Sequence, residues 1–117
     1  MPAKTLGETI QEARSPRFKL REFARLLEVS PTHLSDVENN RRIPSEELLS
    51  QIAQHLGLEL DDLMAAAGRV PEETLRFIEK HPEAISLFRK VTALQPGDFK
   101  ALEKAADDLA RKRGPAK

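Results

Sequence analysis

The chain has 117 residues, a formal net charge of zero at pH 7 and no cysteine. This length is enough for one domain, or for one small domain with an appendage. The lack of cysteine excludes disulfides and thiol chemistry, and no apolar run is long enough to span a membrane. Because nothing near the first residue resembles a signal peptide, we expect a cytoplasmic protein.

Helical periodicity runs along the whole chain, whereas no alternating run of β-branched residues predicts a strand. We therefore predict an all-α fold, with a head of five helices over residues 1–68 and a region of three helices over residues 71–113. The predicted boundary is Gly68-Arg69-Val70-Pro71, where glycine and proline interrupt the pattern. Residues 114–117 are predicted to be a flexible tail.

Two short helices are predicted before residue 30. The first ends at the break formed by Ser15-Pro16, and the second ends at the break formed by Glu28-Val29-Ser30. Their apolar positions recur at helical spacing: Leu6, Ile10 and Ala13 in the first helix, and Leu20, Phe23, Ala24 and Leu27 in the second. Each helix therefore has one side that can pack against a core.

A third helix begins after Ser30, which occupies the N-cap position, with Pro31 at the first helical position. Only Leu34 and Val37 form its apolar side, so few contacts anchor it. Its other positions are short and polar: Thr32, His33, Ser35, Asp36, Asn39 and Asn40. A helix with so polar an outer side is suited to be presented to a partner, and reading the major groove of DNA requires such a helix.

Further helices are predicted in the rest of the chain. Ser45 caps a fourth helix that ends at Gly57, and a fifth helix from about Glu59 to Ala67 stops at Gly68. Later helical stretches cover residues 71–80 and 82–94, and a last helix follows Pro96-Gly97. That last helix carries an apolar stripe with the spacing of a coiled-coil seam: Phe99, Leu102, Ala106 and Leu109.

Basic residues gather near the second and third helices, although the net charge is zero. Between residues 14 and 25 they are Arg14, Arg17, Lys19, Arg21 and Arg25, with Glu22 as the one acidic residue. Arg41 and Arg42 follow the third helix, and acidic pairs such as Asp61-Asp62 lie elsewhere. A local basic face of this kind can bind phosphates.

The chain resembles the phage-repressor/Cro-type (Xre-like) helix-turn-helix regulators of bacteria and phages, over roughly Leu6 to Ala67. The markers are Leu20-Arg21-Glu22-Phe23-Ala24, Val29-Ser30-Pro31, Leu34-Ser35-Asp36-Val37-Glu38, the Pro44-Ser45 step and Ile52-Ala53…Leu56-Gly57-Leu58. Asn40 departs from the family, which usually has glycine after the recognition helix, but asparagine is the next-best residue for a left-handed helix end. The resemblance implies a repressor-like helix-turn-helix head that binds double-stranded DNA and regulates transcription.

The resemblance also implies roles for single residues. Glu38 resembles the family's structural glutamate, which pairs inward with an arginine of the first helix, and Arg14 is the nearest match. The residues expected to bind DNA are Lys19, Arg21, Ser30, Thr32, His33, Ser35, Asp36, Asn39, Arg41 and Arg42.

Within that set, Thr32, Ser35 and Asn39 are predicted to read base edges. The predicted phosphate contacts are Lys19, Arg21, Arg41 and Arg42. His33 contacts a base or a phosphate, or only packs, and the Asp36 carboxylate accepts from cytosine N4 or orients a neighbouring arginine. The alternative for the polar side chains is an ordinary solvated helix face.

The region beyond Pro71 makes a marginal core by itself, and with no cysteine or metal motif its expected partner is a second copy. The residues predicted in or beside the dimer interface are Phe88, Val91, Phe99, Leu102 and Leu109. The chain is then expected to be a homodimeric repressor on a palindromic operator. The alternative is an antitoxin-type adaptor whose C-terminal helices bind a partner protein.

Two modes of regulation are expected as alternatives. Some repressors that resemble this chain are inactivated when a partner metallopeptidase cuts their C-terminal helices, so the resemblance implies control by a cut within Asp98–Arg113. A regulatory protein partner, either such a protease or a toxin, is therefore one expectation. The other is constitutive repression that depends only on protein concentration.

Enzymatic functions lack sequence support. His33, His55 and His81 are too scattered for a metal site, and no glycine-rich phosphate loop or serine nucleophile signature occurs. The carboxylates of Asp61-Asp62 are adjacent and so point to different sides of a helix. The sequence therefore predicts no catalysis, no metal and no cofactor.

Overall fold

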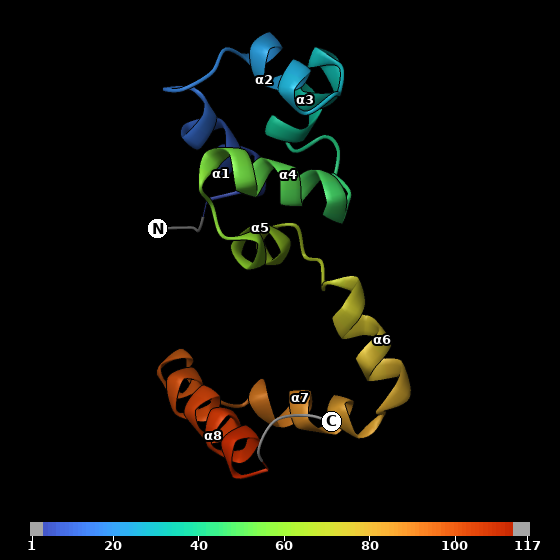
Figure 1. Ribbon diagram of the computed structural model, residues 1–117, viewed down its shortest axis with the longest axis vertical. Helices are drawn as coiled ribbons and strands as arrows, with labels where there is room; N and C mark the ends of the chain where they lie inside the picture. Colours follow the sequence, from blue (N-terminus) through green and yellow to red (C-terminus); the bar gives the residue numbers. More distant parts are fainter. Residues whose placement is uncertain (1–3, 114–117) are drawn as a thin grey trace. The chain divides into compact units, whose positions relative to one another are not determined.

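The structure is a computed structural model that describes residues 4–113, and the predicted flexible tail, residues 114–117, lies outside them. The described residues form eight α-helices and one 3₁₀ helix, with no strand (Figure 1). The predicted all-α class is therefore confirmed. The chain divides between Thr74 and Leu75, and we call residues 4–74 the N-terminal unit and residues 75–113 the C-terminal unit.

The N-terminal unit contains five complete helices and the first turn of a sixth. They are α1 (Leu6–Arg14), α2 (Leu20–Leu26), α3 (Pro31–Glu38), α4 (Glu46–Leu56), α5 (Leu60–Ala66) and the start of α6 (Glu72–Lys80). Both predicted serine caps are present, because the Ser30 and Ser45 hydroxyls accept the backbone N–H three residues later, at 3.0 and 3.1 Å. Local sequence signals therefore place the starts of α3 and α4.

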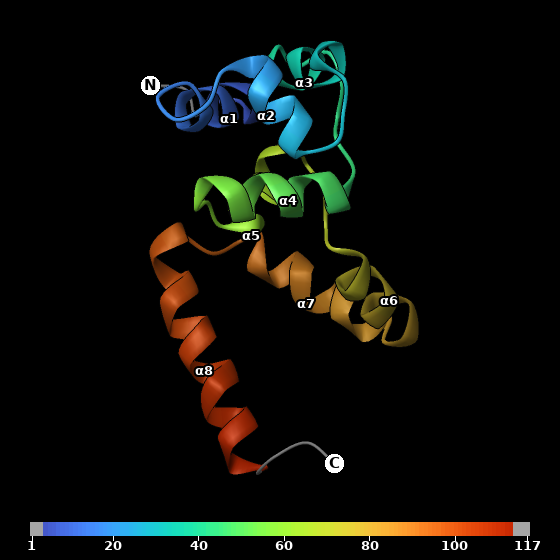
Figure 2. The same cartoon turned by 45° about the horizontal axis from the view of Figure 1, so that its top comes forward.

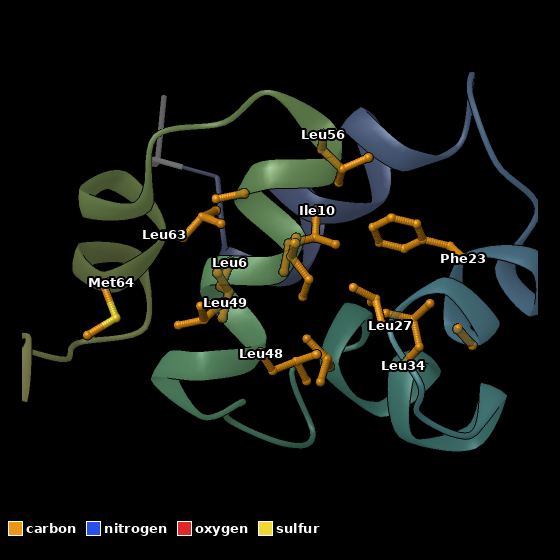
Figure 3. Close-up of a cluster of buried hydrophobic side chains, with 14 residues drawn as sticks. Leu6, Ile10, Phe23, Leu27, Leu34, Leu48, Leu49, Leu56, Leu63 and Met64 are labelled. Carbon is orange, nitrogen blue, oxygen red and sulfur yellow. The ribbon is translucent and has the colours of Figure 1, made fainter.

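A single apolar core joins the five complete helices (Figure 3). Phe23 of α2, Leu27 just after α2 and Leu34 of α3 lie beside Ile10 of α1 in this core (Figure 3). Fourteen apolar residues are buried in it: Leu6, Ile10, Phe23, Ala24, Leu27, Leu34, Val37, Leu48, Leu49, Ile52, Ala53, Leu56, Leu63 and Met64. The short helices α2 and α3 thus obtain their stability from packing, since isolated helices of this length are marginal in water.

Four helices of this unit end in the same left-handed turn, the Schellman motif. The residues with positive φ are Glu28 (59°), Asn40 (60°), Gly57 (67°) and Gly68 (67°). In each turn the next N–H donates to the carbonyl five residues earlier: Val29 to Ala24 at 3.0 Å, Arg41 to Asp36 at 2.8 Å, Leu58 to Ala53 at 2.9 Å and Arg69 to Met64 at 2.9 Å. The sequence predicted this ending at Asn40, Gly57 and Gly68, but only a break in the pattern at Glu28.

Glu28 supports a first prediction, because a residue with a Cβ is disfavoured in the left-handed region. Replacing Glu28 with glycine relieves this strain but adds freedom to the unfolded chain, so we expect the free energy of unfolding to rise by roughly 0.5–1 kcal/mol. The matched control is Gly57→Ala, where an added Cβ meets nothing within 4 Å and only the backbone strain acts. Urea denaturation should give a higher free energy of unfolding for Glu28→Gly than for the parent, and a lower one for Gly57→Ala. A Glu28→Gly variant that is less stable than the parent would show that Glu28 is not strained.

The N-terminus of α1 packs directly on the C-terminal end of α3. The Asn40 side chain makes two hydrogen bonds there: its Oδ1 accepts from the Gly7 N–H and its Nδ2 donates to Thr5 Oγ1, both at 3.0 Å. A Cβ at Gly7 would overlap the backbone carbonyl of Glu38, with its carbon only 2.6 Å away. Asn40 therefore replaces the glycine usual at this helix end with a residue that also fastens α3 to α1.

A capping box completes the start of α1. The Thr5 hydroxyl accepts from the Glu8 N–H, and the Glu8 carboxylate accepts from the Thr5 N–H, both at 3.1 Å. The hydrogen bond from the Thr5 backbone, followed by the one from its side chain, holds the pKa of Glu8 below its ordinary value. The same Thr5 hydroxyl receives Asn40, so the cap of α1 and the end of α3 share one group.

The C-terminal unit contains the rest of α6 with α7 (Glu83–Val91), the 3₁₀ helix η1 (Pro96–Asp98) and α8 (Phe99–Lys112), drawn in ochre to red in Figure 2. None of its described residues is buried. Its large exposed apolar residues are Leu75, Phe77, Ile85, Leu87, Phe88, Leu94, Phe99, Leu102 and Leu109. No helix within residues 4–113 combines the length and the apolar character that a membrane span requires.

Candidate nucleic-acid interface

The pair α2 and α3 is joined by a tight turn and rests on the core. Phe23 and Ala24 of α2 and Leu34 and Val37 of α3 are buried, so the inner sides of both helices are fixed. In the turn between the helices, Val29 follows Glu28 and occupies the position that usually carries the apolar side chain of a Schellman motif. The helix-turn-helix that the resemblance implied is thus present in the described fold, as α2 and α3.

A buried ion pair supports α3 from beneath. Arg14 of α1 donates from Nε to Glu38 Oε2 at 2.6 Å and from Nη2 to Glu38 Oε1 at 3.0 Å. Its Nη1 donates to the Phe18 carbonyl at 2.8 Å. The two side chains are only 10% and 4% exposed, which confirms that Glu38 pairs inward with Arg14.

This pairing changes the charge of the predicted basic face. Arg14 was counted among its basic residues, but its guanidinium is buried and neutralised by Glu38, so it contributes little to the surface. Arg17, Lys19, Arg21 and Arg25 are exposed. Sequence spacing alone could not separate the inward arginine from the outward ones.

The outer side of α3 carries a continuous polar stripe. Thr32, Ser35, Asp36 and Asn39 follow the spacing of one helix face, and Leu34 and Val37 occupy the opposite, buried side. Thr32 and Asn39 are exposed, whereas Ser35 and Asp36 are half-buried. The structure therefore brings the three predicted base-reading residues and Asp36 onto one surface.

Some of these side chains bond within their own helix. Asn39 Nδ2 donates to the Ser35 carbonyl at 2.8 Å and lies 3.3 Å from Ser35 Oγ. Ser30, an expected DNA contact, caps α3, because its hydroxyl accepts a hydrogen bond from the His33 backbone N–H. His33, which is also expected at the interface, is half-buried. Ser30 thus has a structural role whether or not it touches a ligand.

The predicted phosphate contacts lie at two helix ends. Lys19 and Arg21 are exposed at the start of α2, where the Lys19 N–H donates to the Glu22 carboxylate at 3.2 Å. Arg41 and Arg42 are exposed just after α3. Arg41 is held by an ion pair with Asp36, with Nη2 3.0 Å from Oδ1. Orienting a neighbouring arginine was one of the two roles predicted for the Asp36 carboxylate.

The predicted dimerisation residues lie in α7 and α8. Phe88, Phe99, Leu102 and Leu109 are exposed, and Val91 is half-buried. Phe77 in α6 and Leu87 in α7 are as exposed as these residues, at 57% and 54%, and were not among those assigned to the interface. Phe77 and Leu87 are apolar in the sequence, but no sequence pattern fixes which apolar side chains stay uncovered.

No cluster of three or more histidine, aspartate or glutamate side chains within residues 4–113 is arranged to hold a metal ion. Nor does any polar side-chain atom buried in this described part lack a hydrogen-bond partner.

Residues 17–63 match the helix-turn-helix family, a range that contains α2, the turn and α3. The chain is 39% identical over 74 residues to the ImmF control region 10 kDa protein of Bacillus phage phi105, and the match covers 62% of this chain and 82% of that protein.

Two solved structures of the clp gene regulator ClgR from Corynebacterium glutamicum are also similar. One is 32% identical and covers 58% of this chain and 92% of the regulator, with a TM-score of 0.47. The other is 26% identical and covers 77% of this chain and 92% of the regulator, also with a TM-score of 0.47.

Proposed function

Because the chain belongs to the phage-repressor/Cro-type (Xre-like) family of helix-turn-helix regulators, we propose that it is a repressor that binds a palindromic operator as a homodimer. Members of this family are DNA-binding transcriptional regulators and not enzymes. The observation that supports the proposal most strongly is α3, which has a buried apolar side and an exposed polar stripe. Since a regulator acts where the genome lies, we place its action in the cytoplasm.

Residues 1–68 form the DNA-binding head in this proposal. Thr32, Ser35 and Asn39 read base edges in the major groove, because short polar side chains on a rigid helix can reach them. Lys19, Arg21 and Arg42 hold phosphates on either side, and Ser30 and His33 lie at the end of α3 that enters the groove. The phosphate contacts set the register, and the α3 contacts select the sequence.

Replacing a proposed base-reading residue and replacing a proposed phosphate-binding residue should have different effects on DNA binding. A duplex enriched by the parent chain from a random-sequence pool serves as the probe. Thr32→Ala or Asn39→Ala should each cost roughly 1–3 kcal/mol on that duplex and relax the preference at one base pair. Arg42→Ala is the matched control, which should weaken all duplexes alike and lower the salt slope by about one. If Asn39→Ala keeps the parent's affinity and selectivity, the assignment is wrong.

Residues 71–113 form the dimerisation region in this proposal. Its helices are amphipathic, none of the described residues beyond Thr74 is buried, and their apolar sides therefore require a partner surface. A second copy with Phe88, Val91, Phe99, Leu102 and Leu109 in or beside the interface supplies one and sets the two heads on two half-sites. A single head on one half-site binds weakly, and tethering two heads raises their effective concentration.

The exposure of these helices also bears on regulation. A cut within Asp98–Arg113 removes part of the apolar stripe of α8 and so disables the dimer, which is how we propose that a partner protease inactivates the repressor.

The same exposed apolar residues favour a second candidate, an antitoxin-type adaptor whose C-terminal helices bind a partner protein. A monomeric full-length chain that still binds its half-site would support the adaptor over the homodimer.

A further inference from the structure

The turn after α3 brings Arg41 back over the helix. In a Schellman motif the second residue past the cap lies against the residue five positions earlier, and that contact is usually apolar. The turn after α2 follows this rule with Val29 and Ala24. After α3 the same two positions hold Arg41 and Asp36, so an ion pair replaces the apolar contact.

The ion pair fixes the direction of the Arg41 guanidinium. Arg41 Nε and Nη2 both lie 3.0 Å from Asp36 Oδ1, and the Arg41 backbone N–H donates to the Asp36 carbonyl at 2.8 Å. A guanidinium has five N–H groups in one plane, and this pair uses the edge formed by Nε and Nη2. The edge formed by Nη1 and Nη2 is therefore the one that Asp36 leaves for another ligand.

The pair belongs to the polar stripe of α3. Asp36 lies one helical turn after Thr32 on the same face, and its side chain is half-buried while that of Arg41 is 61% exposed. Arg41 therefore reaches this face although it follows the helix in sequence.

We propose that Arg41 reads a guanine, with Nη1 and Nη2 donating to its O6 and N7, and that Asp36 is the positioning residue that holds Arg41 for this contact. The inference rests on the proposed function, and it replaces the phosphate contact that the sequence suggested for Arg41. Bidentate arginine is the commonest specific contact to guanine in the major groove.

Charge favours a base over a phosphate as the partner. Asp36 cancels the charge of Arg41, so the pair gives little of the electrostatic attraction on which phosphate binding depends. A fixed planar fork instead supplies geometry, which is what bidentate recognition requires. A carboxylate on this face that neither positioned an arginine nor accepted from cytosine N4 would repel the DNA backbone.

The test uses the full chain and the duplex that the parent enriches from a random-sequence pool. Arg41→Ala should lower affinity for that duplex roughly 5- to 150-fold and abolish the preference for guanine at one position in each half-site. Asp36→Asn should also lower the ratio of specific to non-specific affinity, although removal of a negative charge by itself strengthens binding to DNA. If Asp36→Asn instead binds more tightly and keeps the guanine preference, the pair has no positioning role.

A change in the DNA isolates the contact. Replacing that guanine with 7-deazaguanine removes the N7 acceptor, and it should weaken the parent but leave Arg41→Ala unchanged. Arg42→Ala is the control, which should remain as sensitive to 7-deazaguanine as the parent. Equal losses for the parent and Arg41→Ala overturn the inference, as does an enriched sequence without guanine in its half-sites.

Thermal unfolding of each variant checks that the fold is intact, which we expect because neither side chain belongs to the buried core. Failure of the proposed function gives a different result, since no sequence is then enriched at all.

Discussion

Replacing Glu38 with alanine should lower the free energy of unfolding by about 3–5 kcal/mol, because the change leaves the Arg14 guanidinium buried without its counter-charge. The Arg14 side chain is 10% exposed, and its Nη1 donates to the Phe18 carbonyl at 2.8 Å, so it is held in the interior. Urea denaturation monitored by circular dichroism measures this loss. The expected loss is a large fraction of the stability of a small domain, which is about 5–15 kcal/mol.

The matched control is the exposed pair of the same chemistry, Asp36 and Arg41. Asp36→Ala should change the free energy of unfolding by about 1 kcal/mol or less, because solvent screens a surface ion pair. A double replacement of Arg14 and Glu38 by apolar side chains of similar volume should recover much of the loss. If Glu38→Ala is no less stable than Asp36→Ala, the buried pair does not hold α3 on α1.

Replacing Leu102 with glutamate should lower affinity for the enriched duplex by roughly 10²–10⁴-fold, because it places a charge on the apolar side of α8 and separates the two heads. Leu102 belongs to the exposed stripe with Phe99 and Leu109. Light scattering should give twice the chain mass for the parent and a single chain mass for Leu102→Glu. A chain that ends at Gly97 should behave like Leu102→Glu, as a proteolytic cut in α8 requires.

Lys100→Glu is the control for this substitution, since it introduces the same side chain two residues away at a position that is already charged. It should keep the parent's mass and most of its affinity. Two results contradict the dimer proposal: a parent with the mass of one chain, or a Leu102→Glu variant that binds the duplex as tightly as the parent.

The positions of the helices could be predicted because their signals are local. Ser30 with Pro31, and Ser45, cap helices that begin at the next residue, and Gly57 ends α4 in the left-handed turn expected of glycine. The exception is Glu28, which adopts the same turn without being glycine. Packing of Val29 and of the core beneath the turn compensates for the strain, and no local pattern reports such packing.

Apart from the pairing of Arg14 with Glu38, which the resemblance implied, contacts between distant segments could not be predicted. Gly7 is required where α1 meets the Glu38 carbonyl, and the Asn40 side chain bonds to Thr5 and Gly7, which lie 35 and 33 residues away in sequence. From the sequence, Asn40 was only a substitute for glycine. Its additional role depends on the packing of α1 against α3, which the family resemblance implied only for Arg14 and Glu38.

The residues that share the polar face of α3 could be predicted from the sequence, but the ion pair on that face could not. Helical spacing alone puts Thr32, Ser35 and Asn39 on one face, since residues three or four apart share a side. The ion pair of Arg41 with Asp36 depends on the left-handed turn at Asn40, which reverses the chain so that Arg41 returns to α3. A residue assigned by its sequence position to the DNA backbone thus lies on the face that we propose reads bases.

Whether the chain is a sequence-specific dimeric repressor can be decided by selecting bound duplexes from a random-sequence pool with the full-length chain and sequencing them. We expect enrichment of one palindromic sequence whose half-sites are centred about one helical turn (~34 Å) apart, because two heads related by two-fold symmetry would each place α3 in the major groove. A pool that remains random after repeated rounds, at a protein concentration where the chain is folded, contradicts that expectation.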